Sequence, residues 1–188
     1  MGSIGPIDSF LDFSIDTERL LLRPCRMEDA DALTALMTPQ ISDRLATWPT
    51  PLSLSETQTI LRNSRQHAMC GTSFPAVVIE KASSTIIGWC KLDCAEGQAD
   101  MGYWIGEAYQ RRGFALEVAK GAIGFAFETL DCHQVRAGAR VDNAASLSLL
   151  KKLGMSPQGI QSFWTPARQR YEDCAFWQLN RDDWRRPR

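Results

Sequence analysis

Apolar residues recur with strand and helix spacings in turn along the first 105 residues. The run Thr17–Pro24 is strand-like, and Pro24 stops it because proline cannot donate to a sheet. Ser53 and Glu56 have the spacing of a capping box, which opens a helix. The pattern therefore predicts, in order, a strand at 17–24, a helix from Glu28 that ends before Pro39, a helix from Ser53 to Ala68, and strands at 74–80, 86–92 and 100–105.

The second half of the chain begins with a long helix that is apolar around most of its circumference. This predicted helix runs from Phe114 to Leu130, and Gly121 and Gly124 within it suggest close packing on a neighbour. The rest of the pattern predicts a strand at 134–141, a helix at 144–153 that ends at Gly154, and strands at 155–162 and 171–179.

These elements predict an α+β fold in a single domain. A seven-stranded, mostly antiparallel sheet carries flanking helices, and the crossover through residues 100–141 makes one pair of strands parallel. We expect residues 1–14 to form an N-terminal arm and residues 15–188 to form the domain.

Composition narrows the classes of function. The 188 residues are 44% hydrophobic and 23% charged with a net charge of −1, which indicates neither nucleic-acid binding nor a membrane partner. No cationic segment precedes an apolar core at the N-terminus, so we expect a cytoplasmic protein. The six cysteines include no C-x-x-C pair, and with only His67 and His133 available we expect no metal site.

The stretch Gln110–Ala115, read Gln-Arg-Arg-Gly-Phe-Ala, joins a predicted strand to a predicted helix. The first N–H groups of a helix lack partners inside it, and the helix dipole adds partial positive charge there. A glycine turn at such a point is suited to an anion, and Arg111 and Arg112 add two formal charges. The spacing G-x-x-x-x-G-K-[ST] is missing, which excludes a P-loop.

Five blocks in a fixed order resemble one known family. Thr17–Arg23, Met101–Ile105, Gln110–Ala115, Asn143–Ser146 and Lys151–Met155 are similar to the motifs of the GCN5-related N-acetyltransferases (GNAT), in the branch similar to RimJ and RimL. The resemblance covers about Ile15 to Leu179. It implies acetyl-coenzyme A as donor, an amine as acceptor, and a splayed parallel pair of strands at 100–105 and 134–141 that receives the pantetheine.

The resemblance also implies which residues bind the donor. Backbone amides of the loop would bind the pyrophosphate. The main chain at Trp104 and Ile105 would form hydrogen bonds with the pantetheine. Asn143 would form a hydrogen bond with the pantetheine arm or with a nearby water. The implied cofactor-binding residues are Trp104, Ile105, Gln110, Arg111, Arg112, Gly113, Phe114, Ala115 and Asn143. Arg111, Arg112, Lys151 and Lys152 are candidates for the 3′-phosphate, although lysines also suit a helix C-terminus without any ligand.

Two residues are the catalytic candidates. Ser146 would stabilise or protonate the leaving thiolate, and Asp100 would accept a proton from the amine directly or through water. Each has a structural alternative: Asn143 and Ser146 can form an ordinary helix N-terminus, and Asp100 can be an exposed charge at a strand end. We expect Tyr103 and Trp104 to use their side chains for packing.

The acceptor and the assembly are open at this stage. The acceptor pocket is expected between the two early helices, the loop around Trp48 and the turn Gln161–Arg170, with Phe163 and Trp164 as further aromatic candidates. The amine is either a protein N-terminal α-amine or a small molecule. The protein is a monomer or a homodimer, and the alternative to an enzyme is a non-catalytic acyl-coenzyme A binding or sensor module.

Overall fold

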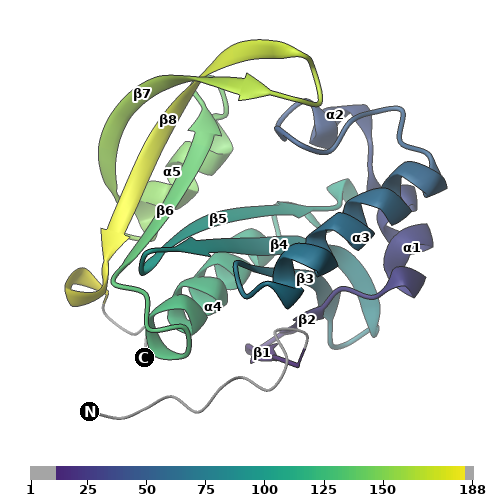
Figure 1. Ribbon diagram of the computed structural model, residues 1–188, viewed down its shortest axis with the longest axis horizontal. Helices are drawn as coiled ribbons and strands as arrows, with labels where there is room; N and C mark the ends of the chain where they lie inside the picture. The colour runs from purple at the N-terminus through teal and green to yellow at the C-terminus, as the bar shows by residue number, and fades with distance from the viewer. Residues whose placement is uncertain (1–11, 185–188) are drawn as a thin grey trace.

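A single mixed sheet forms the centre of the molecule in a computed structural model that describes residues 12–184 (Figure 1). It has eight strands in the order β1-β2-β3-β4-β5-β6-β8-β7, and β5 and β6 run parallel while the other neighbours are antiparallel. The strands are β1 Ile15–Asp16, β2 Leu20–Pro24, β3 Ser73–Glu80, β4 Thr85–Ala95, β5 Gln98–Ile105, β6 Gln134–Arg140, β7 Ser156–Thr165 and β8 Arg170–Asn180.

Helices cover both faces of the sheet. They are α1 Ala30–Leu36, α2 Pro39–Ser42, α3 Leu54–Met69, α4 Phe114–Glu128 and α5 Ala144–Lys152, with short 3-10 turns η1 Met27–Asp29, η2 Glu107–Tyr109 and η3 Arg181–Asp183. The α+β class, the parallel pair and the order of the long elements confirm the predictions from the sequence. No helix within residues 12–184 is long and apolar enough to cross a membrane.

Three details differ from the prediction. The sheet has one strand more than the seven expected, because the two-residue β1 pairs with β2. Pro39 ends the preceding helical pattern and is also the first residue of α2, with Thr38 as N-cap. Proline is tolerated at this position because the first N–H groups of a helix have no partner within it. β7 extends to Thr165, so Phe163 and Trp164 lie in a strand and the turn is short.

Most of the predicted arm lies outside the described residues, including Ile4, Ile7 and Phe10. Phe13 is described, and it packs its ring against Phe74 and Phe125 at centroid distances of 5.7 and 5.3 Å. The chain just before β1 is therefore attached to the core beneath α4.

Two apolar clusters form the core, one on each face of the sheet. The larger cluster packs α4 against the strands through fully buried residues such as Val118 and Ile123. The smaller one lies under α1 and α3 and contains Trp48, Trp89 and Trp104. Alternate residues of β5 contribute their side chains to the two clusters, because successive side chains of a strand point to opposite faces of the sheet. The face on which a β5 side chain lies can therefore be read from its position.

One of the two helical glycines behaves as expected. A Cβ on Gly121 would lie 3.0 Å from the side chains of Ile15 and Thr17, so this glycine permits the close approach of α4 to β1. A Cβ on Gly124 would meet nothing within 4 Å. The expected close packing is therefore confirmed at Gly121 and wrong at Gly124.

The parallel pair separates after three residues. Only Gln98, Ala99 and Asp100 of β5 pair with β6, opposite Gln134, Val135 and Arg136. β5 continues against β4 to Ile105, whereas β6 continues against β8 to Arg140. Figure 1 shows the two strands diverging beyond this point. We call the opening between residues 101–105 and 137–140 the β5–β6 fork, and it matches the splayed pair that the family resemblance implied.

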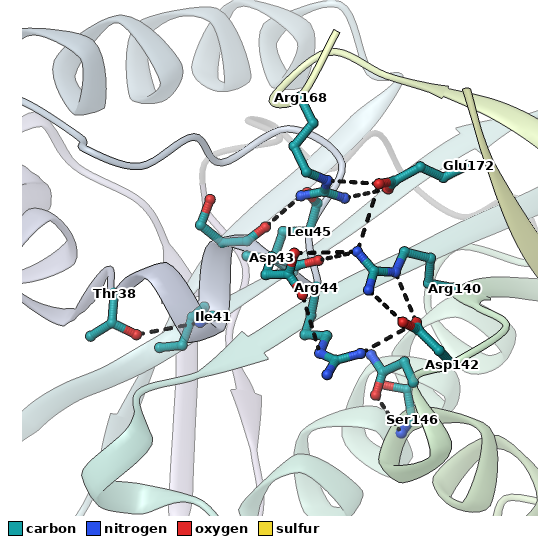
Figure 2. A network of polar contacts seen from close by, with 12 residues as sticks. Thr38, Ile41, Asp43, Arg44, Leu45, Arg140, Asp142, Ser146, Arg168 and Glu172 are labelled. Carbon is teal, nitrogen blue, oxygen red and sulfur yellow. Dashed lines mark hydrogen bonds and ion pairs between the residues drawn. The ribbon is translucent and has the colours of Figure 1, made fainter. Parts of the chain in front are cut away.

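A group of ion pairs, which we call the Glu172 network, ties the segment after α2 to strands β6 and β8 (Figure 2). The nearly buried Glu172 carboxylate accepts from Arg168 at 2.5 Å and from Arg170 at 2.6 Å. Arg168 also donates to the carbonyl oxygens of Ser42 and Leu45 at 2.8 and 2.9 Å. The hydrogen bonds from Arg168 hold the pKa of Glu172 down at about 2.

The network continues from Glu172 toward α5. Arg140 lies 3.6 Å from Glu172 and binds Asp142 at 2.5 Å and Asp43 at 3.3 Å. Arg44 reaches Asp142 from the other side at 3.3 Å. Since Asp142 immediately precedes the N-cap of α5, the network fixes where that helix begins relative to α2.

Glu172→Gln should lower the free energy of unfolding by about 3 kcal/mol at pH 7, because three arginines would lose the carboxylate they surround. The folded pKa near 2 lies below the unfolded value of about 4.3, so the charge stabilises the fold above pH ~4.3 and this contribution is lost as pH falls. The gap between wild type and variant should therefore narrow below about pH 4.

Urea denaturation at pH 7 and at about pH 3.5 measures both effects. The matched control is Asp173→Asn on the same strand, since Asp173 is exposed and should change stability little. A Glu172→Gln effect no larger than that of Asp173→Asn at pH 7 would contradict this account of the network.

Candidate functional site

The loop Gln110–Ala115 leads from η2 into α4 with two residues in the left-handed region. Arg111 has φ 59° and Gly113, the N-cap of α4, has φ 83°. No side chain caps the first turn of α4. Because the first N–H groups of a helix have no partner within it, those of α4 remain available to an anion in front of the helix. Gly113 suits this conformation, which side chains with a Cβ rarely adopt.

The side chains of this loop stabilise it from the protein side. Gln110 donates from Nε2 to the Ile105 carbonyl oxygen at 2.9 Å, which closes the loop. Arg112 forms an ion pair with Glu80 at 2.6 Å and stacks on the Phe114 ring at 4.6 Å. Arg19 stacks on the same ring at 4.6 Å. The Arg112 side chain is therefore engaged with β3 and α4, while the Arg111 side chain is exposed.

Arg19 connects the loop to the body of α4. Its guanidinium donates to the Arg112 carbonyl oxygen at 3.0 Å and forms an ion pair with Glu117 at 2.7 Å. Glu117 also accepts from the Thr17 hydroxyl at 2.7 Å. Burial tends to raise the pKa of Glu117, but the hydrogen bonds from Thr17 and Arg19 outweigh it and lower that pKa. The first turn of α4 is thus held against the segment before β2.

One wall of the fork is the free half of β5. Trp104 is buried in the smaller cluster with its ring 5.2 Å from that of Trp48, and Ile105 is buried in the larger one. The Trp104 side chain thus packs in the core, as expected, and the Ile105 side chain does so too. Beyond Asp100 the described chain places no strand beside β5 on the β6 side, so main-chain groups on that edge are left for another partner.

The other wall carries the first turn of α5. Asn143 is the N-cap of this helix, and its Oδ1 accepts from the backbone N–H of Ser146 at 3.2 Å. Figure 2 shows Ser146 beside the Arg44–Asp142 end of the Glu172 network. The structural alternative for Asn143 is therefore correct, and this cap also fixes the backbone from which the Ser146 hydroxyl projects.

Tyr103 lies on the face of β5 that packs against the larger cluster. Burial raises the pKa of Tyr103 to about 12, so the phenol is protonated at neutral pH. Sequence reasoning assigned Tyr103 to packing, and its ring does pack on the larger cluster. Its position on β5, odd-numbered like Met101 and Ile105, was the signal that it faces the α4 side of the sheet.

Asp100 lies at the closed end of the fork. Its carboxylate is 3.6 Å from Arg136 Nε, its register partner on β6, and its side chain is 64% exposed. Asp100 shares the Gly102 and Trp104 face of β5, which is the face that α3 covers, whereas Tyr103 lies on the opposite face. The two catalytic candidates, Asp100 and Ser146, are therefore associated with different faces of β5.

A cavity of about 720 Å³ lies on the α3 side of the sheet. It is lined by the loop around Pro49, by α3 and by the β7–β8 turn, three of the four elements expected around the acceptor pocket, whereas α1 contributes no lining residue. The aromatic residues suggested for its wall do not line it: Trp48 is buried in the core, while Phe163 and Trp164 are half-exposed on β7. The lining residues are Thr47, Pro49, Ser55, Glu56, Thr59, Ile60, Pro166, Ala167, Arg168 and Gln169.

Charge in this cavity comes from Glu56 and Arg168. Arg168 is neutralised by Glu172, whereas the Glu56 carboxylate accepts from the Ser53 hydroxyl and N–H at 2.6 and 2.8 Å. These hydrogen bonds lower the pKa of Glu56. The cavity therefore presents an ionised carboxylate at neutral pH. Within residues 12–184, no group of three or more His, Cys, Asp or Glu side chains could hold a metal ion.

Comparison with known proteins reveals relatives over most of the chain. The "Uncharacterized N-acetyltransferase p20" of Bacillus licheniformis is 26% identical over 167 residues, which cover 87% of this chain and 93% of that protein. The fold is similar to that of Mycobacterium smegmatis RimJ in complex with CoA-disulfide, with a TM-score of 0.80 at 19% identity over 93% of this chain and 90% of the other.

A second solved structure also has a similar fold. RimL, a ribosomal L7/L12 alpha-N-protein acetyltransferase in complex with coenzyme A, matches with a TM-score of 0.79 at 19% identity, over 91% of this chain and 99% of the other. The profile of the acetyltransferase (GNAT) domain matches residues 19–156, which hold the loop, the fork and Ser146. The chain therefore belongs to the GNAT acetyltransferase family and is an acetyl-CoA-dependent acyltransferase.

Proposed function

We propose that this enzyme transfers the acetyl group of acetyl-coenzyme A to the α-amine of a protein N-terminus. The observation that carries the proposal is the β5–β6 fork, which has an uncapped helix N-terminus on the donor side and a carboxylate-bearing cavity on the face covered by α3. A protein N-terminus as acceptor is supported by the structural likeness to RimL, an alpha-N-protein acetyltransferase.

The loop and the fork would bind the donor. Backbone N–H groups from Arg111 to Ala115 would hold the pyrophosphate, since α4 supplies free donors and a favourable dipole at this end. The main chain at Trp104 and Ile105 would pair with the pantetheine along the free edge of β5. Arg111 is better placed for a phosphate than Arg112, because the Arg112 guanidinium is already paired with Glu80.

Ser146 would act at the leaving group. The acceptor nitrogen attacks the thioester carbon directly, the C–N bond forms, and the C–S bond breaks with its electron pair going to sulfur. A hydroxyl beside the sulfur stabilises the developing thiolate, and a backbone N–H would stabilise the oxyanion. Asn143 supports this role because it holds the Ser146 backbone in place.

Asp100 would receive the proton that the amine loses. Its position on the α3 face of β5 suits an acceptor that enters from the cavity, opposite the donor. The Asp100 side chain is 64% exposed beside Arg136, so water can reach it. A water between Asp100 and the amine serves equally well, since an α-amine with a pKa of about 8 is partly neutral at physiological pH.

The acceptor cavity favours a cationic ligand. Glu56 contributes a carboxylate that no cation within the described chain pairs with, and a protonated amine is attracted to such a group. A small-molecule amine satisfies this requirement as well. The two acceptor classes differ in size, so an acceptor panel separates them.

The proposed function is tested by thiol release from acetyl-coenzyme A with two sets of acceptors, N-terminal peptides and small amines. We expect turnover with peptides that have a free α-amine and none with the same peptides blocked at the N-terminus. Turnover with small amines alone would replace the protein acceptor by a small molecule. No turnover with any acceptor would reject the proposed activity.

Ser146→Ala should lower kcat roughly 100-fold while the coenzyme affinity stays nearly constant, because the hydroxyl acts on the leaving sulfur and not on the bound nucleotide. Thiol-release kinetics and calorimetric titration with coenzyme A measure the two quantities. Ser148→Ala is the matched control, since Ser148 is exposed on the same helix. A kcat equal to that of the control would remove Ser146 from the mechanism.

Gly113→Ala should weaken coenzyme A binding about tenfold, because a Cβ at φ 83° costs roughly 1–2 kcal/mol and shifts the N–H groups that face the pyrophosphate. Gly154→Ala is the control: its φ of 78° imposes the same backbone strain at the end of α5, away from the loop. Calorimetry should give an unchanged Kd for the control. Equal Kd values for both variants would contradict the role of the loop.

A further inference from the structure

Gly102 lies inside strand β5 although the surrounding fold does not require a glycine there. It pairs with Lys91 of β4 as an ordinary strand residue, and its φ lies outside the left-handed region. A Cβ added to Gly102 would meet no atom within 4 Å in the part of the chain that the structure describes. Gly88 on β4 is different, because a Cβ there would lie 2.3 Å from the Trp104 carbonyl oxygen. Packing therefore explains Gly88 but not Gly102.

A glycine inside a strand has a cost for the fold. It loses more conformational freedom on folding than other residues and has no side chain to pack. Such a glycine marks a bulge, a bend, or a place where a ligand or another backbone approaches closely. The pairing of β5 with β4 is regular through Gly102, and the residue is exposed. The space that its side chain would fill is thus open to a ligand from solvent.

Gly102 belongs to the wall of the fork that β5 forms. It is two residues beyond Asp100, the last position that pairs with β6, so the two residues share one face of the strand. The corresponding position on β6, two residues beyond Arg136, is Gly138. There the Phe176 ring covers the backbone, since a Cβ on Gly138 would lie 2.8 Å from a ring carbon. One wall of the fork thus presents bare backbone on this face, and the other presents an aromatic ring.

The proposed proton acceptor lies next to this bare backbone. The Asp100 carboxylate is 64% exposed and 3.6 Å from Arg136 Nε. The Arg136 guanidinium in turn lies 5.8 Å from the centroid of the Phe176 ring. These three side chains therefore form a row across β5, β6 and β8 at the closed end of the fork. An amine that approaches Asp100 along the fork passes over Gly102.

The opposite face of β5 is packed. Met101 and Ile105 are buried in the larger cluster, and Tyr103 packs against it. An acceptor that reaches the fork alongside β5 therefore meets the face of Asp100 and Gly102. Under the proposed function the donor lies along the free edge of the same strand, so the acceptor has to come close to Gly102 to reach the thioester.

We propose that Gly102 is a specificity-determining residue: its missing side chain leaves the space through which the α-amine and the first residue of the acceptor reach the thioester. The inference rests on the proposed function. Gly102 takes no part in the bonds that form and break. It limits the size of the group that can lie beside the reacting nitrogen, so a methyl group at this position narrows the space and an isopropyl group closes it.

The kinetic test compares Gly102→Ala and Gly102→Val with wild type. We expect kcat/KM for peptide acceptors to fall about tenfold with alanine and about 100-fold with valine, because the added atoms overlap the acceptor. The Kd of coenzyme A should change less than about twofold, since the main-chain groups that would bind the donor are kept. Gly124→Ala is the matched control, because a Cβ there also meets nothing within 4 Å of the described chain, but in the body of α4.

The first residue of the acceptor provides a readout that a merely structural role would not move. Gly102→Ala should reduce kcat/KM less for peptides that begin with glycine than for peptides that begin with leucine, by at least about threefold. The reason is that a small first residue leaves room for the added methyl group. An equal loss for both kinds of peptide would overturn the specificity role.

Urea denaturation tests whether the space above Gly102 is free in the resting protein. Gly102→Ala should have a denaturation midpoint no lower than that of wild type, because the strand loses its most flexible residue and the new Cβ meets no neighbour. Gly124→Ala should behave in the same way. A lower midpoint for Gly102→Ala alone would show that the fold itself needs this glycine and would overturn the inference.

The remaining outcomes separate this inference from the proposed function. Wild-type turnover together with wild-type kcat/KM in both Gly102 variants would overturn the role of Gly102 and leave the proposed function standing. A loss of coenzyme affinity as large as the loss of kcat/KM would place the effect on the donor and also overturn it. A wild-type protein that turns over no acceptor would reject the proposed function, and this inference with it.

Discussion

The separation of β5 from β6 is the constraint on which the rest of this structure depends. Two parallel strands that stop sharing hydrogen bonds after Asp100 and Arg136 leave polar main-chain groups without a ladder. Each strand stays in place because its other edge is fully paired, β5 with β4 and β6 with β8. The fork is therefore a stable feature of the sheet, and an extended polar ligand can complete it.

Successive side chains of β5 lie on opposite faces of the sheet, so the polar residues of this strand are distributed between two sides. Tyr103 packs against the larger cluster on the side of α4, while Asp100 shares the side of Trp104 and α3. Side chains on opposite faces of one strand can each contact a different substrate of a direct transfer. The strand itself keeps them in a fixed relation, because β5 is paired with β4 along its whole length.

The charged residues near the fork serve mainly to hold the elements together. Arg112 and Arg19 anchor the loop through Glu80, Glu117 and the Phe114 ring. The Glu172 network does the same for the segment after α2 and the start of α5 (Figure 2). Such partly buried ion pairs contribute little net stability, but they are costly to break singly. They are suited to fixing the distance between α5 and the cavity beside α3.

The sequence by itself determined the order of the long elements, the glycine turn at Gly113 that opens α4 and the cap at Asn143, because each follows from local periodicity or from backbone chemistry. Only the tertiary structure decided that the Arg112 side chain pairs with Glu80 and that Trp48 is buried in the core. The physical reason is that these contacts join residues far apart in the chain, and their partners are chosen by packing and burial that no local pattern encodes.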